Sequence, residues 1–410
     1  MVFGRSSITL HAALMICAVS LLVTSAWAAP QEKVLNSFNG ATGTYPEAGL
    51  IFDQAGNLYG TTFAGGDLNA CGGAGCGTVF ELLPKTGGGW TEKVLHSFHA
   101  GGGSNPAASL IFDSTGNLYG TTEHGGAYGH GTVFELMPQT TGSWAEIVLH
   151  SFNNNSKDGF YPVAGVIFDG KGDIYGTTSA GGSLGGGVVF ELTPERGGRW
   201  SEKLLHSFDV ADKVAGPNGL AFGGNGKLYG ITIDYYGSVF ELTPKAGGVW
   251  SERVLHIFTG GSDGGGPTGL IVDAAGDLYG TGATGGVYYD AGVVFEFVVK
   301  AGGGFTEKVL HDFPAHRGQP MGGVTFDSAG NLYGTLSRGG PEAEGAVFEL
   351  TQQSGGSWTE KSLYNFNPGG GSGDGDDPVA GLILDHAGNL YGTTMGGGTH
   401  KYGTVFEITP

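Results

Sequence analysis

The sequence predicts an all-β fold, a seven-bladed β-propeller of four-stranded antiparallel blades, and three observations carry this prediction. A unit of about 50 to 60 residues repeats seven times along the chain. Each unit contains four short runs rich in β-branched and aromatic residues, and turn residues bound each run. The last unit lacks its fourth run, whereas a matching run stands alone before the first unit. The units therefore indicate a closed ring.

Two dipeptides mark every unit. The tyrosines of the first dipeptide, Tyr-Gly, are Tyr59, Tyr119, Tyr175, Tyr229, Tyr279, Tyr333 and Tyr391. A Phe-Glu pair follows each of them, with glutamates Glu81, Glu135, Glu191, Glu241, Glu296, Glu349 and Glu407. Six units then carry an aromatic residue before the fourth run: Trp90, Trp144, Trp200, Trp250, Phe305 and Trp358. Because no run has a convincing period of 3.6 residues, we expect four strands per unit, which we call a to d.

The two ends of the chain complete one blade between them. The seventh unit ends after its strand c at residues 405–408, and residues 32–38 read as a strand d with no blade before it. Pairing these segments removes an exposed sheet edge that would otherwise promote aggregation. An open solenoid would instead need polar caps at both ends. We expect one propeller domain over residues 29–410, with residues 31–38 supplying the outer strand of blade 7.

Residues 1–28 are predicted to be a cleavable signal peptide. Arg5 provides a short basic region, residues 8–23 are apolar, and Ala26-Trp27-Ala28 fits a cleavage site. The apolar run is too short to favour a membrane span. The protein is therefore expected to be secreted or periplasmic. Its net charge of −19 argues against nucleic acid and anionic membranes as partners, and we expect a monomer.

The repeated motif also resembles a known family. Gly-Asn-Leu-Tyr-Gly-Thr-Thr at residues 56–62, followed by Gly-Thr-Val-Phe-Glu-Leu at residues 77–82, is similar to the GloVer tandem repeat of exported bacterial proteins. The resemblance covers essentially all of residues 31–410. It implies an exported repeat protein, and it brings no catalytic residues, cofactor or substrate.

The connections between strands predict where a ligand would bind. In a four-stranded antiparallel blade, the b–c and d–a connections emerge on one face of the ring and the a–b and c–d turns on the other. The turns are nearly identical from blade to blade, whereas the b–c and d–a loops differ in length and content. This variation indicates a binding face, although long loops can also merely tolerate change.

Three groups of residues on that face are candidate sites. The first is Glu123, His124, Tyr128 and His130 in the b–c loop of blade 2, with His99 in the adjacent d–a loop. Imidazole and carboxylate groups could bind a transition metal or act as acid and base, but the spacing matches no closed metal motif. A solvated polar loop is the alternative.

The second group pairs aromatic rings with carboxylates in blades 4 and 5. It consists of Asp234, Tyr235 and Tyr236, with Tyr288, Tyr289 and Asp290 in the matching loop. Such rings could stack on a sugar or contact a peptide, or could pack the loops onto the ring. The third group, Asp374, Asp376 and Asp377, offers oxygen ligands for Ca²⁺ but lacks the spacing of a defined calcium loop.

Residues that recur once per blade are predicted to be structural. The strand-d histidines His96, His150, His206, His256 and His311 are spread around the outside of the ring and are expected to pack the blades. The Phe-Glu and strand-d glutamates are expected to pair between neighbouring strands. Cys71 and Cys76, the two cysteines left after signal removal, are expected to form a disulfide in the longest b–c loop.

These observations favour an exported, non-catalytic binding or scaffold module that recognises a glycan, peptide or surface partner. No catalytic residue or cofactor is predicted, apart from the possible Ca²⁺. The alternative is an extracytoplasmic propeller enzyme, a hydrolase or lyase. It requires nonrepeated acids, bases or metal ligands from several blades to meet near the ring axis.

Overall fold

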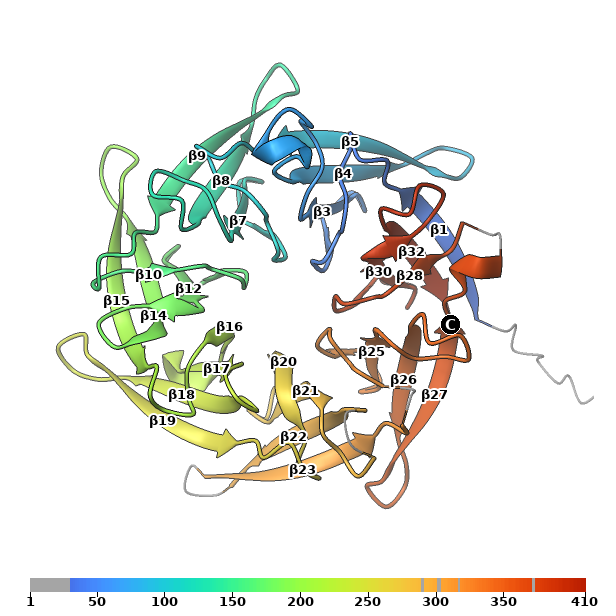
Figure 1. The fold of residues 1–410 in the computed structure, drawn as a ribbon. Coiled ribbons are helices and arrows are strands. Elements are labelled where there is room, and N and C mark those ends of the chain that lie inside the picture. The colour runs from blue at the N-terminus through green and yellow to red at the C-terminus, as the bar shows by residue number, and fades with distance from the viewer. Residues whose placement is uncertain (1–29, 289–290, 301–303, 316–317, 371–372) are drawn as a thin grey trace, which may run out of the picture.

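The computed structural model describes residues 30–288, 291–300, 304–315, 318–370 and 373–410, and the predicted signal peptide lies outside these ranges. Seven antiparallel sheets stand around a central axis, as the fold prediction requires (Figure 1). None of the helices in the described part of the chain has the length and hydropathy of a membrane span.

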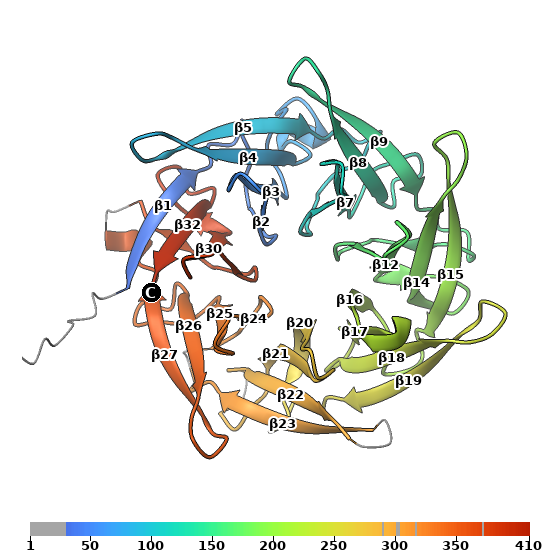
Figure 2. The same ribbon diagram turned by 180° about the vertical axis from the view of Figure 1, so that it is seen from behind.

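Strands a to d run from the axis to the outside of each blade (Figures 1 and 2). Blade 1 contains β2 (Ile51–Phe52), β3 (Leu58–Thr62), β4 (Thr78–Pro84) and β5 (Trp90–Ser97). Blade 2 contains β6 (Ile111–Phe112), β7 (Leu118–Thr122), β8 (Thr132–Pro138) and β9 (Trp144–Ser151). Blade 3 contains β11 (Ile167–Phe168), β12 (Ile174–Thr178), β14 (Gly185–Pro194) and β15 (Trp200–Asp209). Blade 4 contains β16 (Pro217–Phe222), β17 (Leu228–Thr232), β18 (Ser238–Pro244) and β19 (Trp250–Ile257).

The remaining blades follow the same order. Blade 5 contains β20 (Gly265–Val272), β21 (Leu278–Thr284), β22 (Val293–Val299) and β23 (Phe305–Asp312). Blade 6 contains β24 (Thr325–Phe326), β25 (Leu332–Leu336), β26 (Ala346–Gln352) and β27 (Trp358–Asn365). Blade 7 contains β29 (Ile383–Leu384), β30 (Leu390–Thr394), β32 (Thr404–Thr409) and β1 (Gln31–Ser37).

Short elements decorate the loops. Blades 3 and 7 each gain a two-residue pair, β10 (Gly159–Phe160) with β13 (Ala180–Gly181) and β28 (Gly375–Asp376) with β31 (Gly396–Gly397). Three 3-10 turns complete the described structure: η1 (Cys71–Gly73), η2 (Gly224–Gly226) and η3 (Pro368–Gly370).

Closure of the ring by the N-terminal strand is confirmed. β1 pairs antiparallel with β32, from Gln31 opposite Thr409 to Ser37 opposite Thr404. Phe38, which follows β1, is fully buried, and its ring centroid lies 5.0 Å from that of Phe80 in blade 1. The blade 7–blade 1 junction is therefore packed like the other six.

The hydrophobic core lies between the blades. Each of the seven clusters of buried side chains combines residues from two neighbouring blades. At the blade 1–blade 2 junction, the fully buried rings of Phe98 and Phe134 meet edge to face with centroids 5.0 Å apart. The equivalent pairs at the other junctions have centroids 5.0 to 5.2 Å apart.

Steric contact with strand c explains why glycine follows tyrosine in strand b of each blade. A Cβ at Gly60 would lie 2.6 Å from the Phe80 ring. Strand b therefore needs a residue without a side chain where the phenylalanine of the Phe-Glu pair packs against it. The preceding Tyr59 donates a hydrogen bond of 2.6 Å to Glu81 on strand c. The same bond, 2.7 to 3.1 Å long, recurs in blades 2, 3, 5 and 6. Both repeated dipeptides thus serve the architecture.

The repeated histidines connect neighbouring blades. His96 on strand d of blade 1 lies 3.4 Å from Glu146 on strand d of blade 2. The other four histidines face the next blade's strand-d glutamate at 3.5 to 3.8 Å. The strand-d glutamates therefore pair across blade junctions, whereas the Phe-Glu carboxylates pair within a blade, as Glu191 does with Lys203 at 3.1 Å.

Candidate functional site: the loop face

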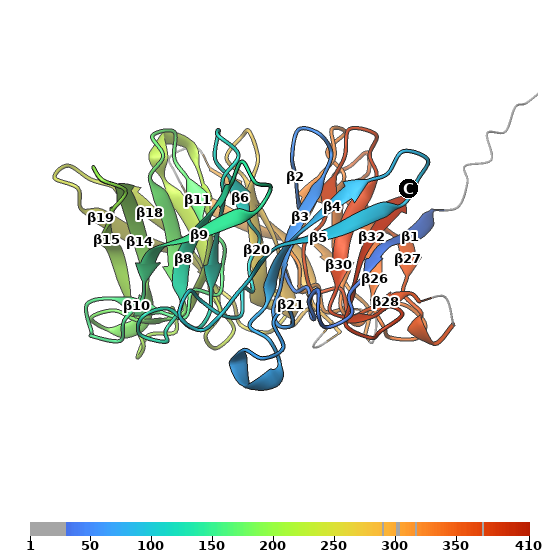
Figure 3. The same cartoon turned by 90° about the horizontal axis from the view of Figure 1, so that it is seen from above.

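We call the side of the ring formed by the b–c and d–a connections the loop face, and the opposite side, formed by the a–b and c–d turns, the turn face. The loop face is turned toward the viewer in Figure 1 and lies below in Figure 3, where η1 projects from it. Figure 2 shows the turn face.

A ring of X-Pro dipeptides surrounds the axis on the loop face. One residue per blade has a positive φ between 54° and 67° and is followed by proline: Tyr45, Asn105, Tyr161, Gly216, Gly266, Gln319 and Asp377. Five of the seven are not glycine, so the surrounding structure must hold them in this unfavourable conformation. This ring was not predicted, although the recurring proline in each d–a segment could have revealed it.

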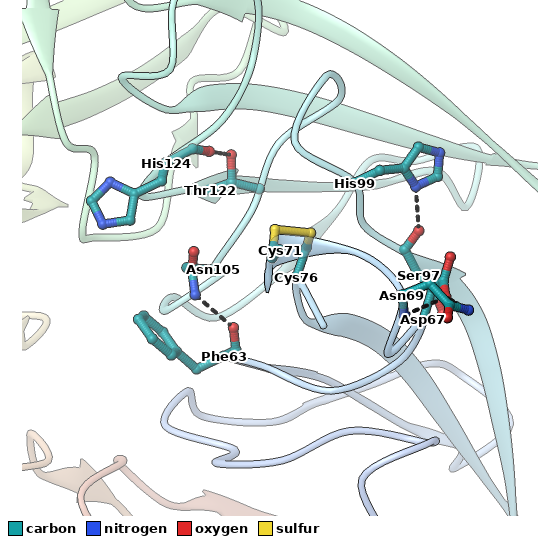
Figure 4. Close-up of a disulfide and its surroundings, with 10 residues drawn as sticks. All are labelled: Phe63, Asp67, Asn69, Cys71, Cys76, Ser97, His99, Asn105, Thr122 and His124. Carbon is teal, nitrogen blue, oxygen red and sulfur yellow. Dashed lines mark hydrogen bonds between the residues drawn. A yellow bond between two sulfur atoms is a disulfide. The ribbon is translucent and has the colours of Figure 1, made fainter. Parts of the chain in front are cut away.

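Backbone hydrogen bonds to two blades hold each of these residues. Asn105 donates its N–H to the carbonyl of Cys76 at 2.9 Å, and its own carbonyl accepts from the N–H of Glu123 at 3.0 Å. Its side-chain amide also donates to the carbonyl of Phe63 at 3.1 Å (Figure 4). Tyr161 repeats the pattern between His130 and Ser179. The side chains at these positions therefore sit on a rigid frame around the axial opening.

The axial opening is a cavity of about 320 Å³ lined by residues from all seven blades. Most of its lining is small or apolar, as in Gly49, Ala108, Ala164 and Gly323. Glu47 is the one residue with an ionisable side chain among the described residues that line the opening. Burial, reinforced by the charges of Glu123 and Asp377, raises the pKa of Glu47 to about 7. The charges of carboxylates from blades 2 and 7 thus act on Glu47 of blade 1.

The residues of the first predicted group, in the b–c loop of blade 2 and the adjacent d–a loop, do not come together in one site. The charge of Glu123 acts on Glu47 of the axial lining, and His124 Nε2 lies 3.5 Å from Glu123 Oε1. The His124 ring meets Tyr161 edge-on at 5.1 Å. His130 packs against Phe160 at 5.4 Å between centroids, and its Nδ1 is buried without a hydrogen-bond partner.

Two further members of that group lie elsewhere. Tyr128 is exposed and borders a depression at the outer part of blade 2. His99 stacks on His96 with 5.9 Å between ring centroids, and its Nδ1 lies 3.1 Å from the carbonyl of Ser97 (Figure 4). The sequence neighbours therefore occupy separate surroundings, and Glu123 with His124 forms the part nearest the axis.

The second predicted group stays on the surface of blades 4 and 5. Tyr235 and Tyr288 are 69% and 53% exposed, respectively. Tyr236 is also exposed, but one edge of its ring lies against Gly260, where a Cβ would collide with it. Asp234 begins the same loop, and its carbonyl accepts a hydrogen bond from the N–H of Gly237 at 2.9 Å. Tyr289 and Asp290 lie outside the described residues.

The third predicted group is spread along a loop that runs from the outside of the ring to the axis. Asp374 is buried at the outside, where it accepts from the Tyr364 hydroxyl at 2.9 Å and the Asn367 N–H at 2.8 Å. Asp377 belongs to the X-Pro ring; burial raises its pKa, which Arg338 opposes. Burial and the charge of Glu344 raise the pKa of Asp376. Among the described residues, these three carboxylates do not come close enough together to form a group that could hold a metal ion.

The predicted disulfide is present. Cys71 and Cys76 are bonded in the b–c loop of blade 1, beside the Asn105–Phe63 hydrogen bond (Figure 4). Cys76 is fully buried in the cluster between blades 1 and 2. The disulfide therefore joins the projecting turn η1 to the core.

The chain matches a known family of repeat proteins along its length. The family described as the Gloeobacter/Verrucomicrobia repeat matches residues 23–236 and again 234–410. The chain belongs to this repeat family. The match confirms the resemblance of the Tyr-Gly and Phe-Glu motifs to the GloVer repeat. No curated protein matches the chain.

Solved structures share the fold of this GloVer repeat protein at low identity. The extracellular domain of a candidate one-component system from Bacteroides thetaiotaomicron is 11% identical, with a TM-score of 0.56 over 92% of this chain and 42% of that one. The extracellular domain of a candidate hybrid two-component system from the same organism is 14% identical, with a TM-score of 0.54 over 93% and 41%. A candidate 6-phosphogluconolactonase from Bacteroides uniformis is 14% identical, with a TM-score of 0.52 over 82% and 87%. At these identities the similarity shows the propeller fold alone.

Exposed tyrosines distinguish the two faces of the GloVer ring. Six described tyrosines are exposed, and all lie in b–c or d–a loops: Tyr45, Tyr128, Tyr235, Tyr236, Tyr288 and Tyr402. Among the described residues, the exposed large apolar side chains of the turn face are Val249 and Val299. The loop face therefore combines exposed aromatic rings with nonrepeated charges.

Proposed function

We propose that this GloVer protein is an exported, non-catalytic binding module that recognises a glycan, peptide or surface partner through its loop face. The observation that carries the proposal is the confinement of all six exposed described tyrosines to that face. Tyrosine supplies a large contact area at low conformational cost and keeps a hydroxyl for hydrogen bonding. Large exposed aromatic side chains gathered on one surface are typical of binding sites.

Among these ligands we favour a glycan. Tyr235 and Tyr236 stand in the same loop as Asp234, and Tyr288 stands in the equivalent loop of the next blade. An aromatic face packs on the C–H side of a sugar ring while carboxylates accept hydrogen bonds from its hydroxyls. The acidic net charge of −19 favours a neutral or basic ligand over an acidic one.

Export is supported by three features. The first 28 residues have the pattern of a cleavable signal, the chain contains a disulfide, and two solved structures with the same fold are extracellular domains. We therefore place the binding face outside the cytoplasm and expect the protein to act as a monomer.

Glycan-array binding followed by calorimetry tests the proposal. The triple variant Tyr235→Ala, Tyr236→Ala, Tyr288→Ala should lose at least about tenfold in affinity, because stacking on one aromatic ring contributes roughly 1 kcal/mol. The matched control is Val249→Ala with Val299→Ala, which removes exposed apolar groups from the turn face. Equal affinity of the triple variant and the wild type would reject the tyrosines as the binding surface.

One observation favours the alternative, an enzyme acting at the axis. Glu47 is a nonrepeated carboxyl in the axial lining with its pKa raised to about 7, the range that suits a general acid or base. Hydrolysis of sugar lactones or glycosides by the wild type, abolished in Glu47→Gln and retained in the tyrosine triple variant, would replace the binding proposal with this one.

A further inference from the structure

At the junction of blades 2 and 3 an aspartate joins the histidine–glutamate pair. His150 lies next to the last residue of strand d in blade 2, and Glu202 is the third residue of strand d in blade 3. The d–a loop folds back so that Asp158 joins them: His150 Nε2 lies 3.2 Å from Asp158 Oδ2 and 3.7 Å from Glu202 Oε1. Among the described residues, these three form the one group of His, Cys, Asp or Glu whose ligand atoms all lie within 4.8 Å.

The group is largely buried. The side chain of Asp158 is 9% exposed, and those of Glu202 and His150 are 17% and 20% exposed. Asp158 Oδ1 and Glu202 Oε1 are both buried without a hydrogen-bond partner. Two buried carboxylates whose ligand oxygens lie within 4.8 Å of each other need a proton or a cation between them.

A second junction has the same three residue types, but there both oxygens of the aspartate accept hydrogen bonds, whereas Glu307 Oε1 is buried without a partner like Glu202 Oε1. Between blades 4 and 5, His256 lies 3.1 Å from Asp263 and 3.5 Å from Glu307. There the hydroxyl of Thr259 donates to Asp263 Oδ1, while the Thr259 N–H donates to Oδ2 at 2.9 Å. Asn153 occupies the corresponding position near Asp158 and donates its N–H to Oδ2 at 3.0 Å, which leaves Oδ1 unpaired.

We propose that His150, Asp158 and Glu202 bind one divalent transition-metal ion. One imidazole nitrogen and two carboxylate oxygens suit Zn²⁺, which binds such atoms at about 2.0 to 2.2 Å and so separates adjacent ligands by roughly 3.3 to 3.5 Å. The separations of His150 Nε2 from the Asp158 and Glu202 oxygens, 3.2 and 3.7 Å, bracket this range, and the two carboxylate oxygens lie within 4.8 Å of each other. The ion neutralises both carboxylates and takes the place of the proton on His150 Nε2.

The site opens onto the loop face. A depression of about 590 Å³ borders all three residues and is also lined by Tyr128, Asn155 and Lys157. Three protein ligands leave a position of a tetrahedral ion free for water or for an oxygen of a bound molecule. The metal site does not involve the tyrosines of blades 4 and 5, so the two proposals stand or fall separately.

Zinc binding to the purified full-length chain tests the proposal. After removal of metals with EDTA and incubation with ZnCl₂, one equivalent of zinc should remain bound through gel filtration. Asp158→Asn and Glu202→Gln should each weaken binding at least about tenfold, since each removes a charged ligand. His256→Asn and Glu307→Gln, the matched substitutions between blades 4 and 5, should leave binding unchanged.

Cobalt provides a readout that needs no variant. Co²⁺ in the same site should give the visible absorption of a tetrahedral nitrogen and oxygen environment, and Zn²⁺ should displace it. Failure of the wild type to retain zinc would overturn the proposal. Undiminished binding by folded Asp158→Asn and Glu202→Gln, checked by circular dichroism, would also overturn it, as would loss of binding in the control variants alone.

Discussion

Pro106 at the start of blade 2 packs against Gly77 at the start of strand c in blade 1. A Cβ on Gly77 would lie 2.6 Å from Pro106 Cδ and would also collide with the carbonyl oxygen of Thr62. The same glycine–proline contact recurs around the ring, for example between Gly403 and Pro46 across the closing junction, where a Cβ would lie 2.5 Å from the proline. The X-Pro ring therefore fixes the spacing of the blades as well as the conformation of the loop face.

Gly77→Ala should destabilise the protein by more than the cost of placing alanine at a positive φ, because the added Cβ would also collide with its neighbours. Gly116 in the a–b turn of blade 2 has almost the same φ, 91° against 93°, but a Cβ on Gly116 would have no neighbour within 4 Å. We expect Gly116→Ala to cost about 1 kcal/mol and Gly77→Ala at least about 2 kcal/mol more. Urea unfolding measures both. Equal losses of unfolding free energy in the two variants would mean that the proline moves away from an added Cβ at little cost.

Phe38→Ala tests how firmly the N-terminal strand closes the ring. Phe38 and Phe98 are both fully buried, and each meets the next blade's phenylalanine at 5.0 Å. Both alanine variants should lose about 3 to 5 kcal/mol of unfolding free energy. A much smaller loss for Phe38→Ala than for Phe98→Ala would show that β1 detaches before the rest of the ring unfolds.

Stability should fall as the pH rises through neutrality. Folding raises the pKa of Glu202 to about 8 and the pKa values of Glu32 and Glu47 to about 7, mainly because all three are buried. The folded state therefore holds protons that the unfolded state releases near pH 4.5, and this stabilisation is lost as pH increases from about 4.5 to 8.

In EDTA, Glu202→Gln should remove part of this pH dependence, on the order of 2 kcal/mol between about pH 5 and 8. Glu360→Gln, at a junction where His311 meets one glutamate, is the control and should leave the slope close to that of the wild type. Thermal melts at several pH values measure the effect. An unchanged slope in Glu202→Gln would contradict the assignment of the raised pKa.

Reducing the disulfide should cost little. Cys71 and Cys76 close a loop of about six residues, for which the chain-entropy estimate is about 2 kcal/mol. The double variant Cys71→Ala, Cys76→Ala should lose slightly more, because Cys76 also packs in the core between blades 1 and 2. Melting with and without dithiothreitol separates the two contributions. Unfolding of the whole ring on reduction would show that the bond does more than secure η1.

The repeat made the architecture predictable. Tyr59 and Glu81 recur in all seven blades and His96 in five, because these residues make contacts that repeat from blade to blade, and such contacts repeat in the sequence. The closing strand was predictable for the same reason, since residues 32–38 match the outer strand of the other units. The X-Pro ring was missed because the left-handed residue itself varies, from Tyr45 to Gly216.

The sites were less predictable because they depend on how irregular loops cross the face. Asp374 and Asp377 are close in sequence, yet one bonds Tyr364 at the outside and the other belongs to the ring around the axis. Conversely, His150 has the repeated role expected of it, and only the path of the loop brings Asp158 back to it. No spacing rule within one repeat could reveal a group assembled from two blades and a loop.

The pairing of β1 with β32 has a kinetic consequence. Lys33 and Glu407, which meet in blade 7, are separated by 374 residues, so this contact has nearly the longest loop the chain allows. Closing such a loop is entropically costly, and contacts of this kind form late in folding. Six blades can assemble in order as the polypeptide emerges, but the ring stays open until its last strand is available. The final step of folding therefore joins the first strand of the ring to its last.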